Sequence, residues 1–294
     1  MFNAFFDRYV EPARARSQLW RLIVGSIVIT VVYLAWLAVL FGVIWLAVGR
    51  DGMVGWSERI ATASTPTATL LLMASFIGMA LAPMAAVRWV HKRSVASLFG
   101  PSVRLVRDFT IAAGTVLAVY AVLLLVWSFW FDAKPNLPFG LWLTFLPLAL
   151  CGLLIQTLAE ELVFRAYLMQ QLAARFRSPL IWMLLPAAVF GIFHYNPGAA
   201  GGNVWIVIGA AAAFGLVAAD LTRITGCIGA AWGYHFANNF VAILILSTEG
   251  TIPGMALYLT PYAIDDTQLV PLLSLGDLAV MVLVWLILRR VVRR

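Results

Sequence analysis

Eight apolar runs constrain the fold of this chain more than any other feature. A transmembrane helix needs about 20 consecutive apolar residues. Runs near this length occur at residues 22–48, 67–90, 109–131, 141–165, 179–195, 203–221, 227–248 and 272–288. With 63% hydrophobic and 11% charged residues, the composition excludes a soluble globular protein. We therefore predict an all-α, polytopic bundle of about eight transmembrane helices, one integral membrane domain over residues 1–294.

The basic residues predict the orientation of this bundle. An even number of helices places both termini on one side of the membrane. If that side is cytoplasmic, the inner segments hold 17 of the 20 Lys and Arg residues, and the outer segments hold the other three: Arg50, Arg59 and Lys134. This bias follows the positive-inside rule, so both termini are predicted to be cytoplasmic. It also explains the net charge of +7 without a nucleic-acid partner.

The segment that follows the fourth run has an amphipathic pattern. Leu168, Leu172 and Phe176 recur at a four-residue step, with glutamines and arginines between them. This spacing predicts a helix with one apolar face. We expect residues 165–178 to lie at the inner membrane surface.

The fourth run ends in two adjacent carboxylates, Glu160 and Glu161, followed by Arg165. An ionisable side chain at the centre of a membrane helix costs about 2.5–3.5 kcal/mol on insertion scales, so such residues need partners or a function. Consecutive helical residues point about 100° apart, whereas residues four apart share a face. We therefore expect Glu161 to pair with Arg165, leaving Glu160 free to face a cavity.

Two later runs bring one histidine each. Phe190 lies one helical turn before His194, where its ring can pack against the imidazole, and His235 shares a helix face with Asn239. A membrane histidine taken alone is more often a helix–helix hydrogen-bond partner than a catalyst. A carboxylate pair, two histidines and an amide on three helices exceed what packing requires, and they match the inventory of a hydrolytic site.

The polar residues form three motifs in a fixed order on separate helices: Glu160-Glu161-x-x-x-Arg165, Phe190-x-x-x-His194 and His235-x-x-x-Asn239. In this order they resemble the CAAX protease and bacteriocin-processing family of intramembrane endopeptidases. The type II prenyl-protein endopeptidases are relatives in that family. The resemblance covers the second half of the chain and implies a protease core at approximately residues 141–248.

The resemblance also implies a role for each motif residue. Glu160 and His194 would activate a water that attacks the peptide carbonyl. His235 and Asn239 would donate hydrogen bonds to the developing oxyanion. The remaining motif residues would support the site: Glu161, Arg165 and Phe190.

The family has been described both as glutamate proteases and as metalloproteases, and the residues leave both chemistries open. His-Glu-x-x-His is absent, yet His194, His235 and Glu160 could supply three zinc ligands and leave a position for water. Asn239 is a poor zinc ligand and a good oxyanion donor. We therefore favour catalysis without a cofactor, with zinc as the alternative.

The implied function is an intramembrane endopeptidase that cuts a membrane-associated peptide or lipidated protein. We expect it to be a multi-pass protein of a bacterial cytoplasmic membrane, in contact with membrane lipid. Two alternatives stay open: a catalytically silent scaffold or immunity protein of the same fold, and a proton-coupled transporter. The chain contains no repeated half with matching broken helices, which a transporter often has.

The catalytic hypothesis sets a condition on depth. If the fourth helix ended at Arg165, Glu160 would lie within about 10 Å of its inner end, whereas His194 lies about 22 Å along from Pro179. For the two side chains to meet, the fourth helix must continue past Arg165 and sit deeper or tilt, or the fifth must begin below the membrane surface.

Overall fold

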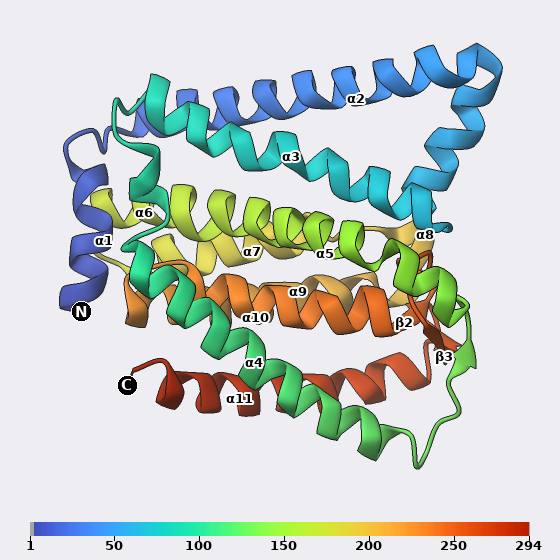
Figure 1. The fold of residues 1–294 in the computed structure, drawn as a ribbon. Helices are drawn as coiled ribbons and strands as arrows, with labels where there is room; N and C mark the ends of the chain where they lie inside the picture. Colours follow the sequence, from blue (N-terminus) through green and yellow to red (C-terminus); the bar gives the residue numbers. More distant parts are fainter. Residues whose placement is uncertain (1–2, 294) are drawn as a thin grey trace.

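The computed structural model describes residues 3–293, and these residues form mainly helices that run side by side in one bundle (Figure 1). In chain order the helices are α1 (Ala4–Arg14), α2 (Leu19–Thr62), α3 (Pro66–Trp89), η1 (Val95–Leu98), α4 (Ser102–Trp127), α5 (Phe139–Glu161), η2 (Leu162–Leu168), α6 (Met169–Arg175), η3 (Leu180–Leu184), α7 (Leu185–Ile192), α8 (Pro197–Ala200), η4 (Gly201–Asn203), α9 (Val204–Thr225), α10 (Gly229–Asn239), η5 (Phe240–Ile245) and α11 (Leu269–Val291). Three of them, η2, η3 and η5, are π-helical. The all-α architecture of a multi-pass membrane protein is confirmed.

Among the described residues, six helical segments are long and apolar enough to cross a membrane: Leu19–Thr62, Pro66–Trp89, Val95–Trp127, Phe139–Arg175, Pro197–Thr225 and Leu269–Val291. The predicted runs at 179–195 and 227–248 are shorter helices, Leu180–Ile192 and α10 with η5. Both termini lie at the same end of the bundle (Figure 1). The count of eight spans and the cytoplasmic side of the termini stay predictions.

The helix that carries the carboxylate pair does continue past Arg165. Residues Phe139–Arg175 form one helical segment, in which the π-helical η2 joins α5 to α6. A π-helix bonds residue i to i+5, and short π segments occur frequently at functional sites. Here the π segment begins directly after Glu161 and contains Arg165.

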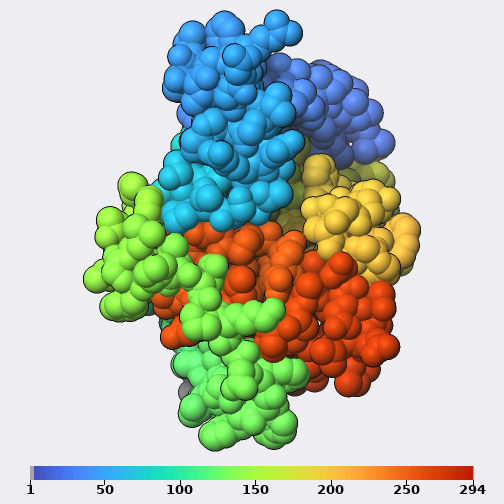
Figure 2. Space-filling model, turned by 90° about the vertical axis from the view of Figure 1, so that its right-hand side faces the viewer, coloured from blue at the N-terminus to red at the C-terminus, as the bar shows by residue number. Residues whose placement is uncertain are grey.

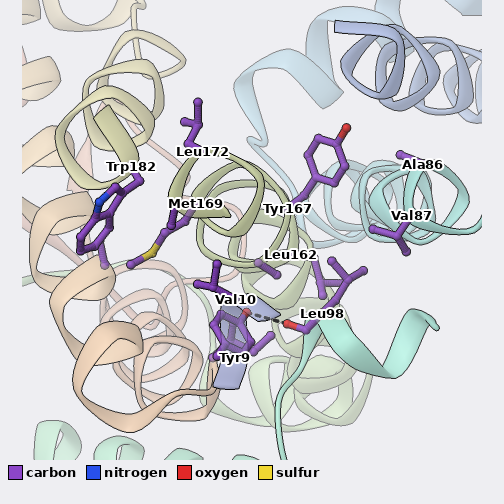
Figure 3. Close-up of a cluster of buried hydrophobic side chains, with 14 of the residues drawn as sticks. Tyr9, Val10, Ala86, Val87, Leu98, Leu162, Tyr167, Met169, Leu172 and Trp182 are labelled. Carbon is purple, nitrogen blue, oxygen red and sulfur yellow. Dashed lines mark hydrogen bonds between the residues drawn. The ribbon is translucent and has the colours of Figure 1, made fainter. Parts of the chain in front are cut away.

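Part of the segment of residues 165–178, which was expected to be an amphipathic surface helix, is covered by α1. The side chain of Gln170 is fully buried and donates to the carbonyl oxygens of Tyr9 (3.1 Å) and Ser97 (2.8 Å). The Tyr9 hydroxyl in turn donates to Leu98 O at 2.7 Å, as Figure 3 shows. α1 therefore packs against Met169 and its neighbours, and this part of the segment belongs to the hydrophobic core.

His91, the third histidine, joins the N-terminal segment to the bundle at this same end. Its Nδ1 donates to the carbonyl oxygen of Arg16 (3.2 Å), and its Nε2 accepts from the Tyr167 hydroxyl (3.0 Å). The ring is 3% exposed, and this burial, with the nearby Arg93 guanidinium, lowers the pKa of His91 from 6.5 to about 4. The folded protein therefore keeps this ring neutral at neutral pH.

Replacing His91 with Gln should weaken the acid sensitivity of the fold. Because the folded-state pKa is lowered, the stability tied to His91 is present above pH 6.5 and is lost as the pH falls towards 4. The loss amounts to at most about 3 kcal/mol. We expect the melting temperature in detergent to fall less between pH 7 and pH 4.5 in His91→Gln than in the wild type. Equal falls in the two proteins would contradict this assignment.

The far end of the bundle holds a small sheet that the sequence analysis did not predict. Its order is β1 (Lys134–Pro135), β3 (Tyr258–Ala263) and β2 (Leu246–Glu249), with β1 antiparallel and β2 parallel to β3. Figure 2 views this end, where chain parts coloured blue, green, yellow and orange-red meet. The sheet fixes the α4–α5 connection against the segment that follows η5.

The α10 helix packs directly against the backbone of α4 through two glycines. A Cβ atom placed at Gly229 would collide with the carbonyl oxygen of Leu105, and one at Gly233 with that of Phe109. This Gly-x-x-x-Gly spacing allows two membrane helices to approach closely. The close approach fixes α10, the helix that carries His235 and Asn239.

Gly233→Ala should therefore destabilise the protein by about 1–3 kcal/mol, the usual cost of overpacking a well-packed core. The measurement is the melting temperature of purified protein in detergent. Gly209→Ala is the matched control, because Gly209 also lies within a helix but an added Cβ meets nothing within 4 Å. A Gly233→Ala protein as stable as the Gly209→Ala protein would contradict the close packing of α10 on α4.

Candidate active site

Three helical segments position the motif residues in the second half of the chain. Glu160 and Glu161 are the last two residues of α5, and Arg165 lies within η2. Phe190 lies in α7, and His194 follows the end of that helix in a turn. The third motif lies on α10, which ends at Asn239.

The depth condition set by the sequence is met. Glu160 precedes Arg175, the end of α6, by 15 residues, which is about 22 Å of helix. His194 follows Leu180, the start of the next helix, by 14 residues, which is about 21 Å. Because the loop of residues 176–179 joins these two helix ends, Glu160 and His194 lie at similar heights in the bundle.

His235 lies between the two adjacent carboxylates. Its Nδ1 is 2.8 Å from Glu161 Oε1, and its Nε2 is 3.2 Å from Glu160 Oε2. The His235 side chain is 4% exposed, Glu161 is fully buried and Glu160 is 12% exposed. Nδ1 is hydrogen-bonded to Glu161, and Nε2 faces Glu160.

Arg165 completes this buried charge cluster. Its Nη1 lies 3.3 Å from Glu161 Oε1, so the ion pair expected from the four-residue spacing is present. The guanidinium carbon lies 4.4 Å from the centroid of the Phe190 ring, a cation–π contact. Arg165 and His235 thus both lie against the carboxylate of Glu161.

Phe190 connects this cluster to the second histidine. Its buried ring packs at 4.8 Å from the ring of His194 and at 6.1 Å from that of His235, measured between centroids. His194 is exposed, and its Nδ1 donates to the carbonyl oxygen of Phe190 at 2.9 Å. In the neutral ring this bond leaves Nε2 as the unprotonated nitrogen, able to accept a proton. Within residues 3–293 no hydrogen bond or ion pair joins His194 to Glu160.

Asn239 lies in a hydrogen-bonded chain of side chains. Its Nδ2 donates to Gln156 Oε1 at 3.0 Å, and its Oδ1 accepts from Asn238 Nδ2 at 3.1 Å. The Tyr120 hydroxyl donates to Asn238 Oδ1 at 3.0 Å. The sequence analysis missed Tyr120, Asn238 and Gln156. Of these three residues, only Gln156 could have been identified from the sequence, since it lies four residues before Glu160 on the same helix face.

Several buried polar atoms of the cluster have no aligned hydrogen-bond partner among the described residues: Glu160 Oε2, Glu161 Oε2, Arg165 Nη1 and Arg165 Nη2. Glu160 Oε2 lies at ion-pair distance from His235 without the alignment of a hydrogen bond. Buried polar atoms in folded proteins nearly always have a partner. The cluster is therefore suited to bind a small polar group such as a water or a peptide carbonyl.

The donor set does not form a metal site. Among residues 3–293, no group of three or more His, Cys, Asp and Glu side chains is placed to hold a metal ion. Glu160 and His235 are adjacent, but the exposed His194 is linked to them only through Phe190. The three ligands predicted for zinc are thus not assembled, and we derive no catalytic step through a metal.

Comparisons with known proteins agree with the motif analysis. The family model described as type II CAAX prenyl endopeptidase Rce1-like matches residues 141–241, which confirms the predicted resemblance. The uncharacterized protein YyaK of Bacillus subtilis (strain 168) is 26% identical over 259 residues, which cover 84% of this chain and 85% of YyaK. No solved structure matches the chain significantly. The chain is thus similar to the CAAX-type membrane proteases over the segment that carries the three motifs.

Proposed function

We propose that this chain is an intramembrane endopeptidase of a membrane-associated or lipid-modified substrate, since residues 141–241 match the family model of the Rce1-like type II CAAX prenyl endopeptidases. One observation carries the proposal: Glu160 lies beside His235 within a buried cluster whose polar atoms lack aligned hydrogen-bond partners, and His194 packs on the Phe190 ring that borders it. A base, a second proton acceptor and a hydrogen-bond donor are thus close together.

In the proposed reaction, a water lies between Glu160 and Nε2 of His194. These groups take a proton from the water as its oxygen attacks the scissile carbonyl carbon. The proton then passes to the leaving nitrogen as the C–N bond breaks, which yields a carboxylic acid and an amine, or the carboxylate and ammonium after proton exchange. The water supplies both the hydroxyl group and the proton, so no further reactant is required.

The oxyanion is stabilised by donors on α10. The Nδ2 of Asn239 carries two hydrogens, of which one bonds Gln156, so the second can bond the oxyanion. Protonation of Glu160 removes the charge that holds Nε2–H of His235. His235 then becomes a second donor at the moment when negative charge develops on the substrate.

An apolar groove next to the cluster supports a hydrophobic or lipid-modified substrate. It has a volume of about 540 Å³ and lies between α2, the η2–α6 segment and the η3–α7 segment. Its lining includes Leu168 and Val189, which are close in sequence to Arg165 and Phe190. A hydrocarbon chain in this groove would hold the attached peptide near the site.

The test is cleavage of a panel of membrane-tethered peptides by the purified protein in lipid nanodiscs. We expect the wild type and His91→Gln to release product and His194→Ala to release at least about 100-fold less, the usual contribution of a proton-transfer group. His91→Gln is the matched control, since His91 lies outside the cluster. Equal product from all three proteins would overturn the mechanism. An inactive wild type would instead favour a silent scaffold or immunity protein.

The zinc alternative is tested in the same assay. We expect a chelator to leave the rate unchanged, because Glu160 and His194 suffice in the proposed reaction. Loss of activity with chelator, restored by one equivalent of zinc per protein, would replace this mechanism with a metal-dependent one.

A further inference from the structure

Asn239 is held at both ends of its amide by neighbouring side chains. Its oxygen accepts from Asn238 Nδ2 (3.1 Å), and its nitrogen donates to Gln156 Oε1 (3.0 Å). Asn238 is held in turn, because its oxygen accepts from the Tyr120 hydroxyl (3.0 Å). The chain of bonds crosses from α4 through the end of α10 to α5.

The hydrogen bonds in this series all run in the same direction, from donor to acceptor. Each amide accepts through its oxygen and donates through its nitrogen, beginning at a hydroxyl and ending at the Gln156 oxygen. Hydrogen bonds in such a series polarise one another. Because the Asn239 oxygen is occupied, the group that remains available on this side chain is an N–H.

The orientation matters for an oxyanion donor. An asparagine amide turned by 180° presents a carbonyl oxygen, which repels negative charge instead of stabilising it. Asn239 is the last residue of α10, where the π-helical η5 begins, so a regular α-helical turn does not continue past it. The hydrogen bonds of Asn239 to Asn238 and Gln156 are therefore important restraints on the orientation of its amide.

We infer that Asn238 and Tyr120 are positioning residues that set the direction of the Asn239 amide. The inference rests on the proposed function, since it assigns the free N–H of Asn239 to the oxyanion. The two residues act through Asn239 and do not touch the reacting atoms.

Asn238→Asp is the most direct test, because it keeps the side-chain shape. The new carboxylate still accepts from Tyr120, but it has no N–H to give to Asn239. A carboxylate oxygen at position 238 would then face the Asn239 oxygen. Because two acceptors repel each other, the Asn239 amide would turn. We expect kcat to fall by about 10- to 100-fold and KM to change by less than about threefold, the signature of an interaction made in the transition state. Tyr120→Phe should lower kcat less, because the Asn238–Asn239 bond remains.

A double-mutant cycle separates positioning from general damage. In an Asn239→Ala background the amide is gone, so adding Asn238→Asp should change kcat by less than about twofold. Gln18→Glu is the control for replacing an amide by a carboxylate, since Gln18 makes no side-chain capping bond at the start of α2, away from the site. It should retain the wild-type kcat.

The outcomes distinguish this inference from the proposed function. An active wild type whose Asn238→Asp variant keeps its kcat, or loses the same factor with and without Asn239, overturns the positioning role alone. A wild type that cleaves nothing overturns the proposed function and the positioning role together. Melting temperatures of all variants in detergent identify any protein that loses activity through unfolding.

Discussion

Glu160→Gln is expected to lower kcat by about 10²- to 10⁴-fold, the range that a general base contributes. Glutamine keeps the shape of the side chain and its contact with His235, but it cannot accept the proton of the attacking water. The fold should survive, because the substitution leaves the contacts of Glu161 with Arg165 and His235 in place. Single-turnover cleavage in nanodiscs measures the effect without interference from product release.

Glu58→Gln is the matched control for this result. Glu58 is an exposed residue of α2, and the same change there should leave kcat unaltered. If Glu160→Gln cleaved as fast as Glu58→Gln, Glu160 would be a structural member of the ion cluster and the base would have to be sought elsewhere.

Arg165→Met is expected to cost about 3–5 kcal/mol of stability, the largest loss we predict for one side chain. Breaking a buried ion pair leaves an uncompensated charge in a low-dielectric interior. Here that charge is Glu161, which is fully buried and lies 3.3 Å from the Arg165 guanidinium. The cation–π contact of Arg165 with Phe190 is lost as well. Melting in detergent at neutral pH gives the measurement.

Two further variants test the cause of that loss. Arg175→Met removes an exposed arginine at the end of α6 and should change stability by less than about 0.5 kcal/mol. The double variant Glu161→Gln with Arg165→Met removes both charges and should recover part of the loss, because no charge is left unpaired. A double variant less stable than Arg165→Met would show that charge pairing is not the main term.

Helical spacing predicted the contacts made within one helix. Residues four apart share a face, so the Glu161–Arg165 pair and the packing of Phe190 on His194 followed from the sequence. The positions of the helices followed from the apolar runs, including the two that form shorter helices.

Contacts between helices could not be predicted in the same way. Spacing along α10 does not show which ring nitrogen of His235 meets which carboxylate, because that depends on the rotation of α10 against α5. The bond between Asn238 and Tyr120 likewise depends on how α10 packs on α4, where Gly233 allows the close approach. Gln170 was placed at the surface because nothing in its own helix shows that α1 covers it.

The π-helical segment η2 sets how the part of the motif helix before it is aligned with the part after it. A π turn accommodates one residue more than the α turn it replaces. If Leu162–Leu168 adopted α geometry with no residue removed, everything beyond the segment would rotate by about 100° relative to α5. Gln170 would then turn away from the carbonyls of Tyr9 and Ser97. The additional residue of the π turn is therefore what aligns the charge cluster with the N-terminal helix.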